Sequence, residues 1–93
     1  MTNPTYNAGA VTVDTQPSLV CTVGNGLSAL LQNTGDVTAY LGGPDVSASG
    51  ANTGFPLPAG TSTTIPKPSA DSAPVDLYAI TASGTTTLSW LTP

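Results

Sequence analysis

In residues 27–43, LSALLQNTGDVTAYLGG, apolar side chains recur at every second position on both sides of a short polar group, at Ala29 and Leu31 before it and at Val37, Ala39 and Leu41 after it. Alternation with period two places every second side chain of an extended strand on the same face. The polar group itself, residues 33–36 (NTGD), has the composition of a tight turn, since Asn and Asp bond to nearby backbone and Gly accepts a positive φ. The stretch therefore predicts a β-hairpin, and the residues GGPD at 42–45 are expected to end its second arm.

The same pattern repeats along the chain in short apolar runs separated by Gly, Pro, Ser and Asn. Further strands are predicted at residues 10–14, 19–23, 61–65, 75–82 and 85–91, with a short extended piece at 55–58. Residues 24–26 (GNG) are expected to form a hairpin loop, and Ser83-Gly84 a two-residue turn between the last two strands. Helix-forming Glu and Arg are absent and Lys occurs once. The sequence predicts an all-β fold, an antiparallel β-sandwich or small β-barrel of about seven short, jelly-roll-like strands.

Particular side chains are expected to point into the core of these strands. In the second strand Leu19, Cys21 and Val23 share one face by alternation, and in the last strand Leu88 and Trp90 do so. The inward residues of the first strand are expected to be Val11 and Val13.

The length of 93 residues fits one domain. Residues 1–9 are predicted to form an extended N-terminal arm, and residues 10–93 a single β domain. Residues 43–60 are the least regular part of that domain, and only Val46, Phe55 and Leu57 look like buried anchors there. Loops of this length are usually functional or locally packed.

Charge and composition exclude several classes of function. The chain has one Lys or Arg, five Asp or Glu and no His, for a formal net charge of −4, and only 6% of its residues are charged. In ordinary soluble domains about 25% of the residues are charged. The surface of this chain must therefore consist mainly of Thr, Ser, Asn, Gly and Pro. Such a surface suits a protein outside the cytosol or in a large assembly. A single cation cannot displace the counterions of nucleic acid. No apolar run approaches the roughly 18 residues of a membrane span, and the N-terminus does not resemble a signal peptide.

The residues that might support catalysis or bind a metal favour simpler roles. A dyad of Ser69 with Lys67 is disfavoured because a lysine in an exposed loop keeps its proton, and Cys21 is expected to act as a small buried hydrophobe. The five aspartates are expected at turns, except Asp76, which should face solvent from a strand. Asp45 and Asn52 do not have the spacing of a calcium loop. We therefore predict no catalytic residue, no metal site, no cofactor and no enzymatic activity.

Side chains without an evident core role are candidates for an interface. Tyr6 and Tyr40 are the aromatic candidates, because Tyr is enriched at protein interfaces. Core packing is expected for Trp90 and Phe55. The complete set of interface candidates, drawn from the arm, the central stretch and the long loop, is Pro4, Tyr6, Tyr40, Val46, Phe55 and Leu57.

Three segments carry a resemblance to a known group of proteins. Residues 32–43 (QNTGDVTAYLGG), 57–60 (LPAG) and 77–91 (LYAITASGTTTLSWL) resemble, in order, segments of small β-rich virion proteins of tailed bacteriophages, notably phages of actinobacteria. These segments are fold-forming turns and strands, and none is a catalytic motif.

The resemblance implies a non-enzymatic virion structural protein. Within that class it favours a capsid decoration (cementing) protein, a homotrimer on the outer surface of the head shell whose partner is the major capsid protein, assembled in the host cytoplasm. Residues 1–9 and 43–60 are then the expected shell contacts, since they lack a core pattern. The alternative is a tail- or fibre-associated module, or a carbohydrate-binding module for a host surface, in which Tyr6, Tyr40 and Phe55 would stack on sugar rings.

Overall fold

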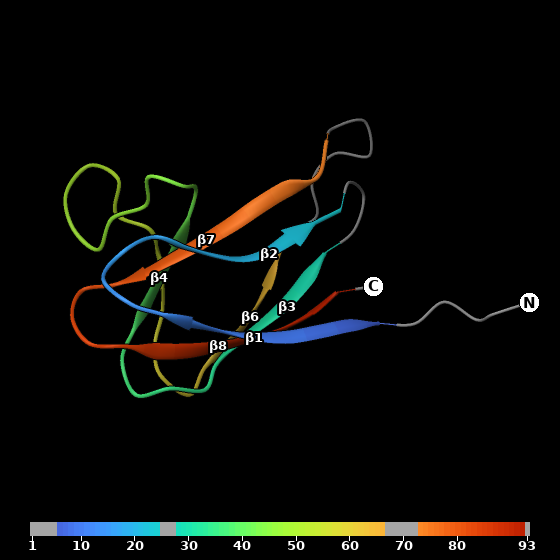
Figure 1. Ribbon diagram of the computed structural model, residues 1–93, viewed down its shortest axis with the longest axis horizontal. Coiled ribbons are helices and arrows are strands. Elements are labelled where there is room, and N and C mark those ends of the chain that lie inside the picture. Colours follow the sequence, from blue (N-terminus) through green and yellow to red (C-terminus); the bar gives the residue numbers. More distant parts are fainter. Residues whose placement is uncertain (1–5, 25–27, 67–72, 93) are drawn as a thin grey trace, which may run out of the picture.

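The computed structural model describes residues 6–24, 28–66 and 73–92 and contains eight β-strands and no helix in these segments (Figure 1). The strands are β1 (Asn7–Val13), β2 (Ser18–Val23), β3 (Ala29–Asn33), β4 (Ala39–Gly42), β5 (Phe55–Leu57), β6 (Ser62–Ile65), β7 (Val75–Thr81) and β8 (Thr86–Thr92). The all-β prediction is confirmed. The one strand beyond the seven that were expected is β5. The sequence indicated it only as an extended piece, and it pairs with β4. Within the described segments, no helix is long and apolar enough to cross a membrane.

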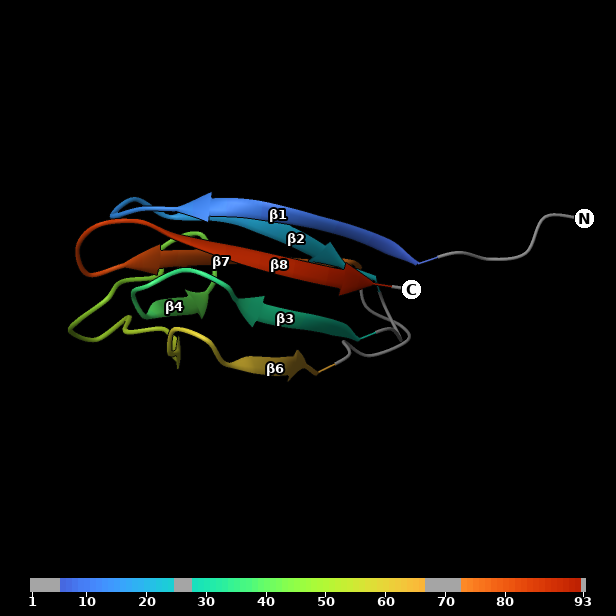
Figure 2. The ribbon, with the colours of Figure 1, turned by 90° about the horizontal axis from the view of Figure 1, so that it is seen from below.

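The strands form two four-stranded antiparallel sheets that pack as a sandwich. The first, here the β1 sheet, has the order β1-β8-β3-β6, and Figure 2 shows these strands side by side in that order. The second, the β2 sheet, has the order β2-β7-β4-β5. All consecutive strands except β4 and β5 lie in opposite sheets. Eight antiparallel strands connected in this way form a jelly roll, so a sandwich is the correct alternative rather than a barrel.

The predicted hairpin over residues 27–43 is wrong, although both of its arms are strands. β3 pairs with β6 and β8 in the β1 sheet, whereas β4 pairs with β5 and β7 in the β2 sheet. The polar residues between them therefore form a corner at which the chain changes sheet. The physical reason is that the Asn33 side chain is fully buried and fixes this corner rather than closing a two-stranded turn.

The two other expected hairpin turns also connect opposite sheets. β2 and β3, on either side of residues 24–26, do not pair, and residues 25–27 lie outside the described segments. Ser83-Gly84 joins β7 to β8, which are likewise in different sheets. Gly84 has a φ of +71°, which a glycine accepts without strain. The turn composition was recognised correctly, but the pairing of the flanking strands was not.

Inward side chains of the two sheets meet in an aliphatic core. Val13, Leu31 and Leu88 of the β1 sheet are completely buried, and Trp90 packs against the same cluster, as predicted. The β2 sheet contributes Leu41 and Leu57. The expected core position of Phe55 is wrong, because its side chain is 63% exposed.

An irregularity in β2 changes which of its residues face the core. The register with β7 shifts between Leu19 and Cys21, so that Val20 and Cys21 are both buried. A bulge of this kind inserts one residue and reverses the alternation on one side of it. Leu19 is therefore 47% exposed instead of sharing the inner face with Cys21 and Val23, as alternation had predicted.

β1 begins at Asn7, earlier than the strand expected from residue 10. Residues 7–9 belong to the strand and pair with residues 90–92 of β8, although the sequence placed them in the arm. Residues 1–5 of that predicted arm lie outside the described segments.

Candidate interaction surfaces

The acidic and thiol side chains of the described segments are dispersed over the fold. These segments contain no group of three or more His, Cys, Asp or Glu that would hold a metal ion. Burial raises the pKa of the Cys21 thiol, which keeps it protonated and a poor nucleophile. Asp14 accepts a hydrogen bond from the Gln16 backbone N–H (2.9 Å), and the exposed Asp76 accepts one from the Thr22 hydroxyl (2.7 Å). These two aspartates have the turn-forming and solvent-facing roles expected of them, while Lys67, Ser69 and Asp71 lie outside the described segments.

In the described segments, the side chain of Asn33 makes four hydrogen bonds at the corner between β3 and β4. Its Nδ2 donates to the backbone carbonyls of Val37 (2.8 Å) and Leu57 (2.9 Å). Its Oδ1 accepts from the Thr86 hydroxyl (2.6 Å) and the Gly35 backbone N–H (3.1 Å). One amide thus joins the end of β3, its following turn, the end of β5 and the start of β8. We assign Asn33 a structural role, because every polar atom of its side chain is used within the fold.

The outer side of the β1 sheet forms a broad surface that we call the uncharged face. Strand alternation and register place Leu91 of β8 between Ala8 of β1 and Leu30 of β3, and Thr64 of β6 beside Leu30. Leu30 is 47% and Leu91 37% exposed, although both lie in the middle strands of the sheet. The whole face consists of Ala8, Ala10, Thr12, Leu30, Gln32, Ser62, Thr64, Thr87, Ser89 and Leu91. None of these side chains is charged.

The sequence analysis missed Leu30 and Leu91, although a signal for both was present. Each follows or precedes another large apolar residue in a strand, in the pairs Leu30-Leu31 and Trp90-Leu91. Since adjacent side chains point to opposite faces of a sheet, one member of each pair must face outward. Leu31 and Trp90 pair with each other on the inner side, which leaves Leu30 opposite Leu91 on the outer side.

The outer side of the β2 sheet has a different chemistry. Tyr40 of β4 lies between Ile80 and Pro56, and Tyr78 of β7 lies between Leu19 and Gly42. Both tyrosines are half-buried. This surface also presents the carboxylate of Asp76, so it is aromatic and acidic where the opposite face is aliphatic and uncharged.

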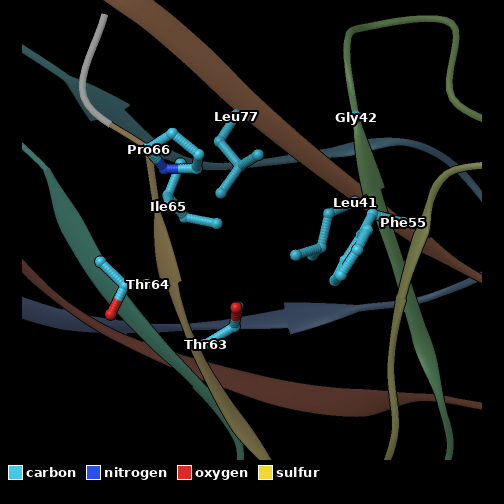
Figure 3. Close-up of a pocket in the computed structure, with 8 residues that line it drawn as sticks. All are labelled: Leu41, Gly42, Phe55, Thr63, Thr64, Ile65, Pro66 and Leu77. Carbon is cyan, nitrogen blue, oxygen red and sulfur yellow. The ribbon is translucent and has the colours of Figure 1, made fainter.

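A cleft of about 350 Å³ opens between the two sheets. Figure 3 shows Leu41 and Phe55 on one side of it, with Ile65, Pro66 and Leu77 opposite. It exists because β4 pairs only with residues 78–81 of β7, so residues 75–77 of that strand have β2 as their one neighbour. The cleft is mainly apolar, with Thr63 and Thr64 of β6 as its polar lining.

The predicted interface residues fall into three groups. Tyr6 is 71% exposed just before β1, and Phe55 is exposed beside the cleft. Tyr40 is near Phe55 on the paired strands β4 and β5, but it is only partly accessible. Val46 and Leu57, 5% and 2% exposed, are buried within the chain and present almost no surface. Pro4 lies outside the described segments.

The loop after β4 explains the burial of Val46. Its side chain packs so closely on Gly42 and Gly54 that a Cβ at either glycine would lie within 3 Å of it. Backbone hydrogen bonds from Ser47 to Asn52 (3.0 Å) and from Gly54 to Ser47 (2.9 Å) close the loop on itself. The irregular segment is therefore locally packed, one of the two alternatives that its length suggested.

Neither a protein-family model, nor a curated protein, nor a solved structure matches this chain.

Proposed function

We propose that the protein is a non-enzymatic virion structural protein of a tailed bacteriophage, a decoration protein that binds the outer surface of the head shell and stabilises it. Each copy would bridge neighbouring copies of the major capsid protein and add binding free energy that opposes expansion of the shell. The protein would be assembled in the host cytoplasm and remain on the outside of the virion. The resemblance of residues 32–43, 57–60 and 77–91 to phage virion proteins supports this assignment.

The observation that carries the proposal is the uncharged face. A flat sheet surface with exposed Leu30 and Leu91, and no charged group to desolvate, is suited to contact with another protein. A hollow of about 200 Å³ on this face, lined mainly by Leu30, Gln32, Ser89 and Leu91, is smaller than most small-molecule sites. Jelly rolls are found in viral capsid domains, but also in lectins. The fold is thus only an analogy, and the argument depends on this surface.

Two leucines with the same exposure on opposite sheets provide a matched test. Leu30 on the uncharged face and Leu19 on the β2 sheet are both 47% exposed. We expect purified protein to bind undecorated heads of the phage whose genome encodes it. In a sedimentation assay Leu30→Asp should weaken binding at least tenfold, about 1.4 kcal/mol, and Leu19→Asp less than twofold.

Two results would contradict the proposal. If the wild-type protein does not sediment with undecorated heads, the decoration function is wrong. If Leu19→Asp weakens binding as much as Leu30→Asp, contact through the uncharged face is wrong. The unfolding midpoint of each variant serves as the control for loss of structure. The trimeric state implied by the resemblance is a separate prediction; it excludes the two-fold dimer inferred in the next subsection, and the solution mass distinguishes the two.

Carbohydrate binding by a tail- or fibre-associated module is the second candidate, favoured by one observation. Phe55 is 63% exposed and lies at the cleft, which Thr63 lines with its side chain. An aromatic ring can cover the apolar side of a sugar while nearby hydroxyls hydrogen-bond to it, and the cleft volume falls within the usual range for ligand sites. Titration with host cell-wall glycans should then give binding that Phe55→Ala abolishes; no binding at millimolar glycan would exclude this candidate.

A further inference from the structure

The four edge strands of the sandwich differ in how well they are protected against pairing with another chain. An exposed edge presents unpaired N–H and C=O groups, which proteins usually block with short strands, prolines, charges or bulges. β5 has three residues with Pro56 at its centre, and β6 has four residues followed by Pro66. β2 follows Pro17 and contains the irregularity between Leu19 and Cys21. Three of the four edges are therefore blocked.

β1 has none of these devices. It is seven residues long, NAGAVTV, without a proline or a charged residue, and it pairs with β8 in continuous register from Asn7 to Val13. Among the described residues, no backbone hydrogen bond outside the strand ladders involves residues 7–13. Figure 2 shows β1 as the outermost strand of its sheet. Within the described segments, β1 is thus the one long edge strand whose second side is open.

We propose that this edge pairs with β1 of a second copy of the chain, antiparallel and about a two-fold axis at Ala10. The two β1 sheets would then form one continuous sheet of eight strands, with Ala10 opposite its own counterpart and Ala8 opposite Thr12 of the second copy. A pairing of seven residues forms about six to eight backbone hydrogen bonds.

Two observations favour a second copy of this chain as the partner of β1: no like charges meet across the edge, and a two-fold contact limits assembly to two chains. The chain has a formal net charge of −4, yet two β1 strands place no like charges opposite each other. The two-fold arrangement brings Tyr6 opposite Asp14 of the second copy. The Tyr6 ring, which is 71% exposed in the single chain, could then pack against the second copy. Because the other three edges are blocked and a two-fold contact is self-complementary, assembly stops at a dimer.

The pairing also enlarges the uncharged face. Four strands about 4.8 Å apart, with about six residues of 3.3 Å rise each, give a face of about 400 Å². A specific protein interface buries about 800 Å² on each partner. Two faces joined through β1 provide that area as one surface. The inference does not require the decoration function, since it concerns the purified protein alone.

The first experiment measures the solution mass by light scattering at about 100 μM. The expected value is twice the chain mass of 9.2 kDa. Ala10→Lys places two ammonium groups across the axis, while its side chain remains on the exposed outer side of the β1 sheet. We expect it to raise the dimer Kd at least tenfold. The matched control is Ser62→Lys, an equally outward position on the opposite edge strand of the same sheet, which should leave the mass unchanged.

A cross-link provides the second measurement and does not depend on the folding of a charged variant. Cα atoms directly opposite in an antiparallel pair are about 4.5–5.5 Å apart, within the range that a disulfide spans. Ala10→Cys should therefore oxidise to a covalent dimer, whereas Ser62→Cys should not. Trp90 fluorescence checks that β1 is in place, because the indole packs against Gly9. A wild-type monomer, a trimer, or a dimer insensitive to Ala10→Lys and not cross-linked by Ala10→Cys would overturn the proposal.

Discussion

The two sheets are joined very differently at the Asn33 corner and at the cleft. At the corner one buried amide makes four hydrogen bonds, to Leu57 of the β2 sheet, to Thr86 of the β1 sheet and to two residues of the connecting turn. At the cleft, Leu41 and Phe55 face Ile65 and Leu77 across about 350 Å³. The corner is polar and satisfied, whereas the cleft is apolar and incompletely filled.

The difference indicates which region fixes the fold and which can adapt. A buried polar network holds one geometry, because any shift leaves groups unpaired in a medium of low dielectric constant. Apolar contacts are not directional, so side chains around a cleft can move without such a loss. We therefore expect substitutions at the corner to affect stability most, and substitutions at the cleft to affect it little.

Replacing Asn33 should have the largest effect. Asn33→Ala leaves two carbonyls, one backbone N–H and one hydroxyl without their partner, at about 1 kcal/mol each. The free energy of unfolding should fall by about 3–4 kcal/mol, a large part of the 5–15 kcal/mol typical of a domain. Urea denaturation measures this change.

A smaller substitution and a surface control sharpen the same prediction. Thr86→Val removes only the 2.6 Å hydrogen bond to Asn33 and should destabilise by about 1 kcal/mol. Asn52→Ala, in the exposed part of the loop between β4 and β5, should stay within about 0.5 kcal/mol. Equal effects at Asn33 and Asn52 would show that the corner does not hold the sheets together.

Phe55→Ala should change stability much less, despite the loss of a large aromatic ring. Because the side chain is 63% exposed, most of its area is already in contact with water in the folded state. We expect a decrease of less than about 1 kcal/mol in the same urea assay, compared with 3–5 kcal/mol for a buried Phe. A loss in the buried range would mean that the cleft is closed in solution, and the contrast with the corner would fail.

The smallest effect concerns Cys21, which pairs in register with Leu77 of the cleft wall. Burial raises the pKa of its thiol above the ordinary value of 9.0. The unfolded chain therefore ionises this group at a lower pH than the folded one, so its contribution to stability is complete below pH 9 and is lost as the pH rises further. The stability difference between wild type and Cys21→Ala should shrink from pH 8 to pH 10. A constant difference would indicate that solvent entering through the cleft already reaches the thiol.

The sequence was sufficient to predict where most strands lie, but not which strands pair. Period-two alternation located the segments of β3 and β4, since alternation is a local property of each strand. Asn, Gly and Asp between them suit a hairpin and a sheet-crossing corner equally well, because both require a sharp change of direction. The pairing was decided by Asn33, whose side chain bonds to Leu57 and Thr86, residues distant in the chain.

The candidate surfaces were predicted in part for the same reason. Tyr6 was predicted as an interface residue and is 71% exposed, whereas Phe55 was expected in the core and Leu30 was overlooked. Phe55 is exposed because β4 and β5 are short and leave residues 75–77 of β7 uncovered. The lengths of strands relative to their neighbours are not encoded in any local pattern. Leu19 faces outward because of a bulge that alternation does not anticipate.

By itself the sequence determined an all-β chain of short strands and a composition almost without charge, because composition and alternation act residue by residue. Only the tertiary structure decided that most consecutive strands cross between sheets, that Asn33 joins the sheets, and that β1 is the one unblocked edge among the described strands. These features depend on contacts between residues far apart in the chain, whose free energies are not contained in any local segment.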